Sequence, residues 1–154
     1  MAMLSEQLKQ QLKERFQERL RDPVQLTLHT RPGGGRLILP GGLGCATCGD
    51  ARELAEDLAA AAPDLVRLEI VDVSERSGLE WPVPSLSLAA AAPEDAQSSG
   101  RLGWQGLPAG HEFATVVDAM ERVSNREPGL SEATLQALSA LTEPVEVMVF
   151  ATPT

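Results

Sequence analysis

Residues 41–50 read GGLGCATCGD and contain the only two cysteines of the chain, Cys45 and Cys48. Apolar and β-branched residues, followed by glycines, come before this stretch. Residues 51–58, ARELAEDL, come after it and carry leucine and alanine at helical spacing. The pattern predicts that the two cysteines lie where a loop enters a helix.

Cysteines in this position have the chemistry of a redox-active dithiol. Free backbone N–H groups and the positive end of the helix dipole favour an anion in the first helical turn, and so favour the thiolate of Cys45. A thiolate is the species that attacks a disulfide. Cys48 lies one turn further along and can then attack the mixed disulfide and release the product. We therefore predict that Cys45 is the nucleophile and Cys48 the resolving cysteine.

Two other interpretations of the pair remain open. A CxxC motif can supply half of a zinc site, which normally needs four ligands. His29 and His111 are the other candidate ligands, and neither has a ligand-like spacing to the cysteines. We therefore expect no metal. The pair can also be structural, because free cysteine is among the most buried residue types.

Length and charge limit the class of protein. A chain of 154 residues suits one domain with an additional element at one end. A net charge of −9 argues against a nucleic acid or an anionic membrane as the partner. The chain contains no apolar run near the ~20 residues of a membrane span, and its first residues do not resemble a signal peptide. We expect a cytoplasmic protein.

Apolar residues recur every four positions from Leu4 to Leu20, so residues 1–22 are predicted to contain an amphipathic helix that ends at Asp22. This helix is expected to pack on the domain that follows. Residues 24–30 alternate as a strand, and residues 36–40 form a second apolar run. Either run can supply the strand that leads to the cysteines.

A βαβ unit is predicted around the cysteine pair. Its helix runs to Ala62, and residues 65–73 form a strand that pairs in parallel with the preceding one and suits the centre of the sheet. Residues 85–88 and 101–105 indicate an antiparallel hairpin, and an apolar helical face begins after His111.

The end of the chain forms a separate segment, residues 128–154, after a folded unit at 23–127. A helix capped by Ser131 is predicted at residues 130–141, and a strand at residues 145–150. The strand is expected to dock on a sheet edge or to pair with another chain as a homodimer.

The order βαβ-ββα, with CxxC at the start of the first helix, resembles the thioredoxin/glutaredoxin fold. Residues 106–113, GLPAGHEF, the helix at the N-terminus and residues 144–154 resemble the protein disulfide oxidoreductases of thermophilic prokaryotes, which contain two glutaredoxin-like units. By this resemblance, residues 23–127 would be one thioredoxin-like unit, and the helix and strand at 128–154 resemble the start of a second one. The short stretch at 74–83 resembles the N-terminal domain of the flavoprotein subunit of alkyl hydroperoxide reductase. The resemblance implies an α/β three-layer sandwich, α-βαβ-ββα, with an extra C-terminal helix and strand.

The resemblance also implies a function. Cys45 and Cys48 would form the redox pair, and Pro84 would be a cis-proline that turns the backbone of Val83 toward a bound substrate. The expected activity is that of a thiol-disulfide oxidoreductase with no cofactor. It would act on protein disulfides and receive electrons from a thiol or flavoprotein reductase. The alternative is a redox-inactive scaffold or docking unit of a larger disulfide oxidoreductase or peroxide-reductase system.

Overall fold

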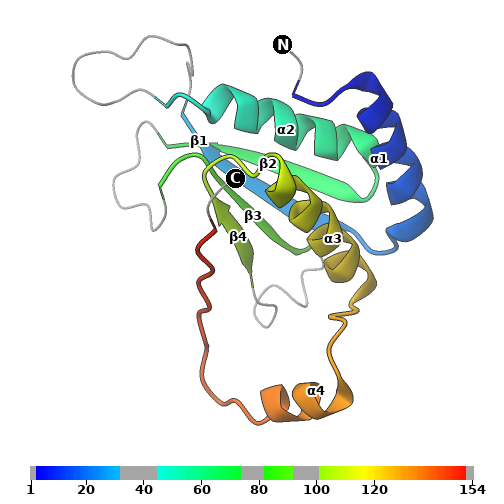
Figure 1. The fold of residues 1–154 in the computed structure, drawn as a ribbon, viewed down its shortest axis with the longest axis vertical. Helices are drawn as coiled ribbons and strands as arrows, with labels where there is room; N and C mark the ends of the chain where they lie inside the picture. Colours follow the sequence, from blue (N-terminus) through cyan, green and yellow to red (C-terminus); the bar gives the residue numbers. More distant parts are fainter. Residues whose placement is uncertain (1–2, 32–44, 74–81, 92–100, 152–154) are drawn as a thin grey trace.

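The computed structural model describes residues 3–31, 45–73, 82–91 and 101–151. These residues form a four-stranded mixed sheet in the order β2-β1-β3-β4, with helices packed against it (Figure 1). The elements follow the chain as α1 (Glu6–Arg19), β1 (Val24–Thr30), α2 (Cys48–Ala61), β2 (Val66–Asp72), β3 (Ser85–Ala90), β4 (Leu102–Gln105), α3 (His111–Asn125) and α4 (Glu132–Ser139).

Pairing between strands confirms the predicted βαβ unit and the hairpin. β1 pairs in parallel with β2, with Val24 opposite Val66, and α2 lies between the two strands in the sequence. β3 pairs antiparallel with both β1 and β4. Among the described strands, β1 is therefore central and β2 lies at an edge, so the prediction of a central position for residues 65–73 is wrong for this sheet. The alternative run at 36–40 lies outside the described residues.

The hydrophobic core lies on one face of the sheet. Strict alternation in β1 places Leu26 and Leu28 on this face, and the register places Leu86 and Leu88 beside them. These four leucines are buried in one cluster with apolar residues of α1, α2 and α3, among them Phe16. The opposite face of β1 carries Gln25, Thr27 and His29, which are polar. The described residues thus contain the sheet and the helical layer on this face, and residues 74–81, between β2 and β3, lie outside them.

The N-terminal helix is packed on the domain as predicted. Ser5 caps α1 by accepting a hydrogen bond from the Leu8 N–H, and the side chain of Phe16 is fully buried. Arg15 of α1 forms ion pairs with Asp118 and Glu121 of α3. The helix is therefore anchored by its apolar stripe and by its polar flank.

The end of the chain differs from the prediction. The predicted helix is confirmed as α4, whose cap Ser131 accepts a hydrogen bond from the Thr134 N–H. Residues 145–150, predicted as a strand, form none: they have no partner in the described sheet and are exposed. A strand needs hydrogen bonds from a neighbour, and apolar alternation alone does not supply one.

Within the described ranges, no helix has both the length and the apolar character needed to cross a bilayer.

Candidate functional site

The cysteine pair lies at the start of α2, beside the end of the central strand. Cys45 precedes the helix, Ala46 and Thr47 form a turn, and Cys48 is the first helical residue. Apolar residues at helical spacing, including Leu54 and Leu58, bury one face of α2 in the core. Because the same face carries Cys48, packing of the helix fixes the position of the second cysteine.

The two cysteines are joined in a disulfide. The sulfur atoms are 2.02 Å apart and the Cα atoms 5.4 Å apart. Cys48 is almost completely buried, with 1% of its surface exposed, whereas Cys45 is half-buried. Cys45 is therefore the sulfur that an external thiol or disulfide can approach.

Pro84 lies beside the disulfide. The Val83–Pro84 peptide bond is cis, and the Val83 carbonyl oxygen lies 3.9 Å from Cys45 Sγ. Pro84 itself is buried, and its carbonyl accepts a hydrogen bond of 2.8 Å from the Gly106 N–H. The structure thus brings together all three predicted site residues, Cys45, Cys48 and Pro84, although their sequence separation reaches 39 positions.

Thr30 is a further member of the site that the sequence analysis did not identify. It ends β1, is fully buried, and its hydroxyl donates to the Cys48 carbonyl at 3.5 Å. The Thr30 carbonyl accepts a bond of 3.0 Å from the Val73 N–H, just beyond β2. The alternation of residues in β1 could have indicated this residue, because it places Thr30 on the same buried face of the strand as Leu26 and Leu28.

The electrostatics of the site favour an anion at Cys45. The N–H groups of the first helical turn lack partners within α2, and the dipole of the helix has its positive end here. Asp50, in the same turn, is exposed to water, which screens its opposing charge. The field of the helix therefore supports a thiolate at Cys45 when the disulfide is reduced.

The two histidines lie apart from any metal-binding group in the part of the chain that the structure describes. His29 is half-buried within β1, opposite Val71 and Ser85. His111 is exposed at the start of α3. Residues 3–31, 45–73, 82–91 and 101–151 contain no group of three or more His, Cys, Asp and Glu side chains able to hold a metal ion.

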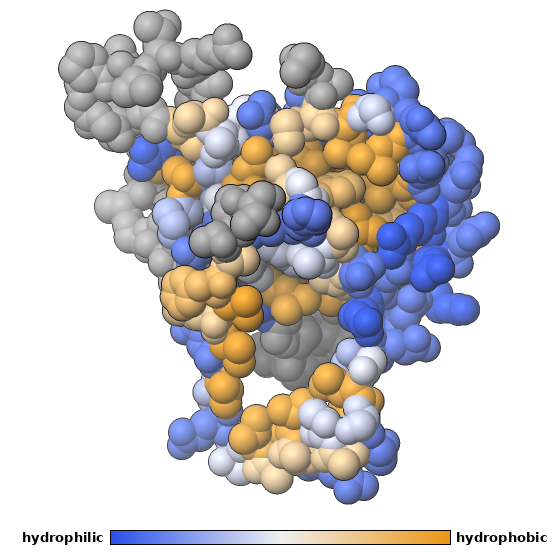
Figure 2. Space-filling view, viewed as in Figure 1, coloured by the Kyte–Doolittle hydropathy of each residue, from blue (hydrophilic) through white to orange (hydrophobic). Residues whose placement is uncertain are grey.

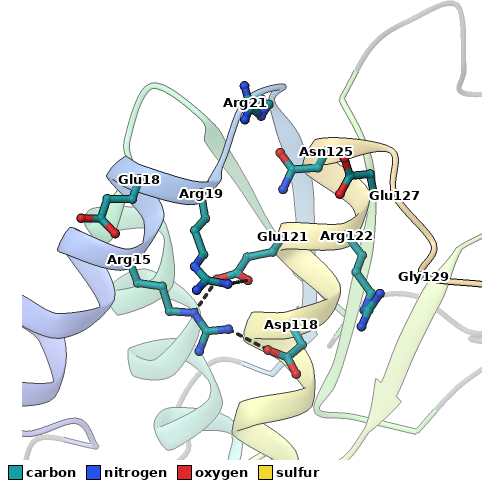
Figure 3. A pocket seen from close by; sticks show the side chains of 10 residues that line it. All are labelled: Arg15, Glu18, Arg19, Arg21, Asp118, Glu121, Arg122, Asn125, Glu127 and Gly129. Atoms are coloured by element: carbon teal, nitrogen blue, oxygen red, sulfur yellow. Dashed lines mark hydrogen bonds and ion pairs between the residues drawn. The ribbon is translucent and has the colours of Figure 1, made fainter.

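A polar cavity of about 420 Å³ lies between α1 and α3, away from the cysteines (Figure 3). It adjoins the start of β1, whereas the cysteines adjoin the other end of this seven-residue strand, about 20 Å away. Glu121 is paired there with Arg15 and Arg19. The lining consists of Arg15, Glu18, Arg19, Arg21, Asp118, Glu121, Arg122, Asn125, Glu127 and Gly129. Because of this separation, the cavity is no part of the cysteine site. Its ion pairs join α1 to α3.

A CxxC disulfide at the start of the helix in a βαβ unit, beside a cis-proline that opens an antiparallel hairpin, defines a thioredoxin-like fold. Among solved structures, the chain is similar to a protein disulfide oxidoreductase from Aeropyrum pernix K1. The two share 26% sequence identity with a TM-score of 0.66, over 89% of this chain and 55% of that one.

Two structures of the alkylhydroperoxide reductase AhpF from Enterococcus faecalis V583 are also similar. The first shares 20% identity with a TM-score of 0.64, and the second, of the NTD_N/C domain, shares 19% with a TM-score of 0.65. The matches cover 90% and 91% of this chain, and 61% and 62% of those chains. At these identities the likeness shows the fold alone.

The chain spans less than two thirds of the length of each of these three proteins. Neither a protein-family model nor a curated protein sequence matches it. The resemblance to both groups that the sequence predicted is confirmed in the solved structures.

Proposed function

We propose that the protein is a thiol-disulfide oxidoreductase that cycles Cys45 and Cys48 between dithiol and disulfide. The observation that carries this proposal is the asymmetry of the pair. The accessible sulfur of Cys45 lies at the positive end of α2, and it is bonded to the buried sulfur of Cys48. Attack from outside is thereby directed to one sulfur, and the other is held ready for the second step.

In the reducing direction, the Cys45 thiolate attacks one sulfur of a substrate disulfide. A mixed disulfide forms, and the other substrate sulfur leaves as a thiolate. Cys48 then loses its proton and attacks Cys45 Sγ, so that the Cys45–Cys48 disulfide forms and the second substrate thiolate leaves. Two electrons pass from the dithiol to the substrate, and the reverse sequence oxidises a substrate dithiol.

We assign Val83 and Pro84 to substrate contact. The Val83 carbonyl lies beside Cys45 Sγ, so a peptide that reaches this sulfur passes along the backbone at this point. An extended peptide can hydrogen-bond to such a backbone as a short strand. Protein disulfides therefore fit the site as substrates.

The test uses reduction of insulin disulfides by the full chain. Cys45→Ser is expected to abolish turnover, because it removes the attacking sulfur. Cys48→Ser is expected to retain the first step and to accumulate a mixed disulfide visible by non-reducing mass spectrometry. Ser139→Ala, in α4 and outside the site, serves as the control and keeps full activity. Equal residual activity in both cysteine variants would contradict the assigned roles.

The alternative function is a redox-inactive docking unit, and the exposed apolar residues at the end of the chain favour it as a second candidate. Labelling of the reduced, folded protein with iodoacetamide at neutral pH separates the two functions. A working nucleophile at Cys45 is labelled quickly, whereas an inert pair resists labelling. A redox titration against glutathione adds a second criterion, because working oxidoreductases have potentials between about −270 and −120 mV.

An electron donor is needed to complete the cycle. The similarity to an alkylhydroperoxide reductase supports a reductase as partner, and we propose a thiol or flavoprotein reductase in this role. The proposed setting is the cytoplasm, where the dithiol would take part in electron transfer and cell redox homeostasis. Co-purification with a reductase that restores insulin reduction from a nicotinamide donor would support this assignment.

A further inference from the structure

Exposed large hydrophobic side chains gather at one end of the described chain. Ten of the described residues are of this kind, and nine of them lie between Leu130 and Phe150. We call residues 130–151 the C-terminal arm. It comprises α4, which has no buried residue, and the extended segment after it. Figure 2 shows the hydrophobic colour of this arm, with α4 below the main body and the extended segment rising from it on the left.

The composition of the arm defines what can cover it. Its helix carries Leu135 and Leu138, Leu141 follows the helix, and its extended part is VEVMVF at residues 145–150. Phe150 is 93% exposed and Val149 86%. The arm contains three glutamates and no lysine, arginine or histidine. Its partner must therefore offer apolar surface without negative charge.

The two edges of the described sheet differ in their charge and in their exposed apolar side chains. β2 presents the exposed charges of Arg67, Glu69 and Asp72, and charged side chains are a common protection of a sheet edge. β4, at the other edge, contains no charged residue. It also carries Leu102, 45% exposed, which among the described residues is the one exposed large hydrophobic side chain outside the arm. β4 is thus the unprotected edge.

We propose that the protein pairs with a second copy of itself, residues 145–150 of each copy adding as a strand to the β4 edge of the other. Each copy carries both the apolar donor segment and the uncharged acceptor edge, and in a single copy both remain uncovered. A twofold arrangement uses each surface once and closes the assembly at two chains. The arm has 22 residues and β4 has four, so an interface of roughly 20–30 residues per side includes α4 of the arm as well as residues 145–150. The pairing goes beyond the proposed function, because it does not depend on the cysteines.

The first measurement is the mass of the full chain in solution by light scattering. We expect twice the chain mass of 16.4 kDa at high concentration and dissociation on dilution. The arm variant Val147→Glu/Val149→Glu and the edge variant Leu102→Glu are each expected to raise the dissociation constant at least about tenfold, because charge replaces buried apolar contact. The control Gln11→Glu/Gln17→Glu adds two negative charges to the exposed side of α1 and is expected to leave the dimer intact.

Mixing the two variants tests the pairing of arm with edge. The arm variant keeps an intact β4 edge and the edge variant keeps an intact arm, so a heterodimer retains one of the two contacts. We expect mixing to restore dimers of one chain of each kind. Absence of this rescue would overturn the proposal, as would a wild-type chain that stays monomeric at all concentrations.

Amide hydrogen exchange of the wild-type chain provides a measurement that needs no variant. Protection of the outward-facing amides of β4 is expected to rise with protein concentration. Protection that is independent of concentration in a monomer would mean that the chain's own arm covers the edge, which also overturns the proposal.

Discussion

At the scale of single residues, Ser124 joins the two ends of the folded unit. It is fully buried near the end of α3. Its Oγ accepts hydrogen bonds from the N–H groups of Arg21 and Asp22, at 2.8 and 3.1 Å, and donates to the Asp22 carbonyl at 2.7 Å. These backbone groups belong to the turn between α1 and β1, and the Asp22 N–H also donates to the Ser124 carbonyl at 3.3 Å. One hydroxyl thus satisfies three polar groups of a distant segment.

We predict that Ser124→Ala lowers the free energy of unfolding by about 1–3 kcal/mol, because it removes the three hydrogen bonds of a fully buried hydroxyl. Urea denaturation of the oxidised protein measures the change. Ser139→Ala removes an exposed hydroxyl that donates to the Gln136 carbonyl of its own helix, and this control is expected to change stability by less than about 0.5 kcal/mol. Equal effects of the two substitutions would show that the bonds of Ser124 contribute nothing specific.

At the scale of elements, an ion pair fastens α1 to α2. Lys9 Nζ lies 2.9 Å from Asp57 Oδ1, and the Asp57 side chain is largely buried. The hydrogen bond to Asp57 raises the pKa of Lys9 above its ordinary value of 10.5, with desolvation acting in the opposite direction. The charged form of Lys9 is therefore favoured in the folded state.

The sign of this shift predicts how stability depends on pH. Because the pKa of Lys9 is higher in the folded state, its contribution is present in full below pH 10.5 and is lost as the pH rises through the folded-state pKa. The stability difference between wild type and Lys9→Met should stay constant from pH 7 to about 9.5 and decline above 10.5.

Few other side chains of this protein titrate in the pH range where Lys9 does. The chain has no tyrosine and only two lysines, Lys9 and Lys13, and both cysteines are held in the disulfide when oxidised. Lys13→Met removes an exposed lysine from the same helix and serves as the control. A difference for Lys9→Met that does not change above pH 10.5 would contradict the linkage.

At the scale of the whole molecule, the folded unit and the C-terminal arm contribute unequally to stability. The hydrophobic core contains residues of α1, α2, α3 and the sheet but none of α4. The left-handed backbone of Arg126 ends α3, and its N–H bonds to the carbonyls of Arg122 and Val123. The last helix of the core is thus completed before the arm begins.

We therefore predict that a chain ending at Gly129 unfolds at low protein concentration with the same free energy as the full chain, to within about 0.5 kcal/mol. Only the full chain should gain stability as its concentration rises, because association binds the folded state. Thermal unfolding of both chains over a hundredfold range of concentration measures this. A shorter chain that is less stable at every concentration would mean that the arm supports the core of its own copy.

Features that depend on residues close together in the sequence were predicted, and features that depend on distant residues were not. Apolar spacing from Leu4 to Leu20 predicted α1, and Ser131 correctly marked the start of α4, because periodicity and capping are local properties. The CxxC spacing likewise located the cysteine pair. The roles of Ser124 and Thr30 were not predicted, because their hydrogen-bond partners lie far away in the chain and leave no local sequence pattern.

The sequence by itself determined where the described helices and sheet strands lie, which face of α1 and α2 is apolar, and where a dithiol can form. Only the tertiary structure decided that β1 is central and β2 lies at an edge, that Val83 faces Cys45, and that residues 145–150 have no strand partner in the described sheet. The reason is physical. A pattern of apolar residues indicates which side chains are buried. Strand order and site geometry depend instead on hydrogen bonds and contacts between segments that come together only when the chain folds.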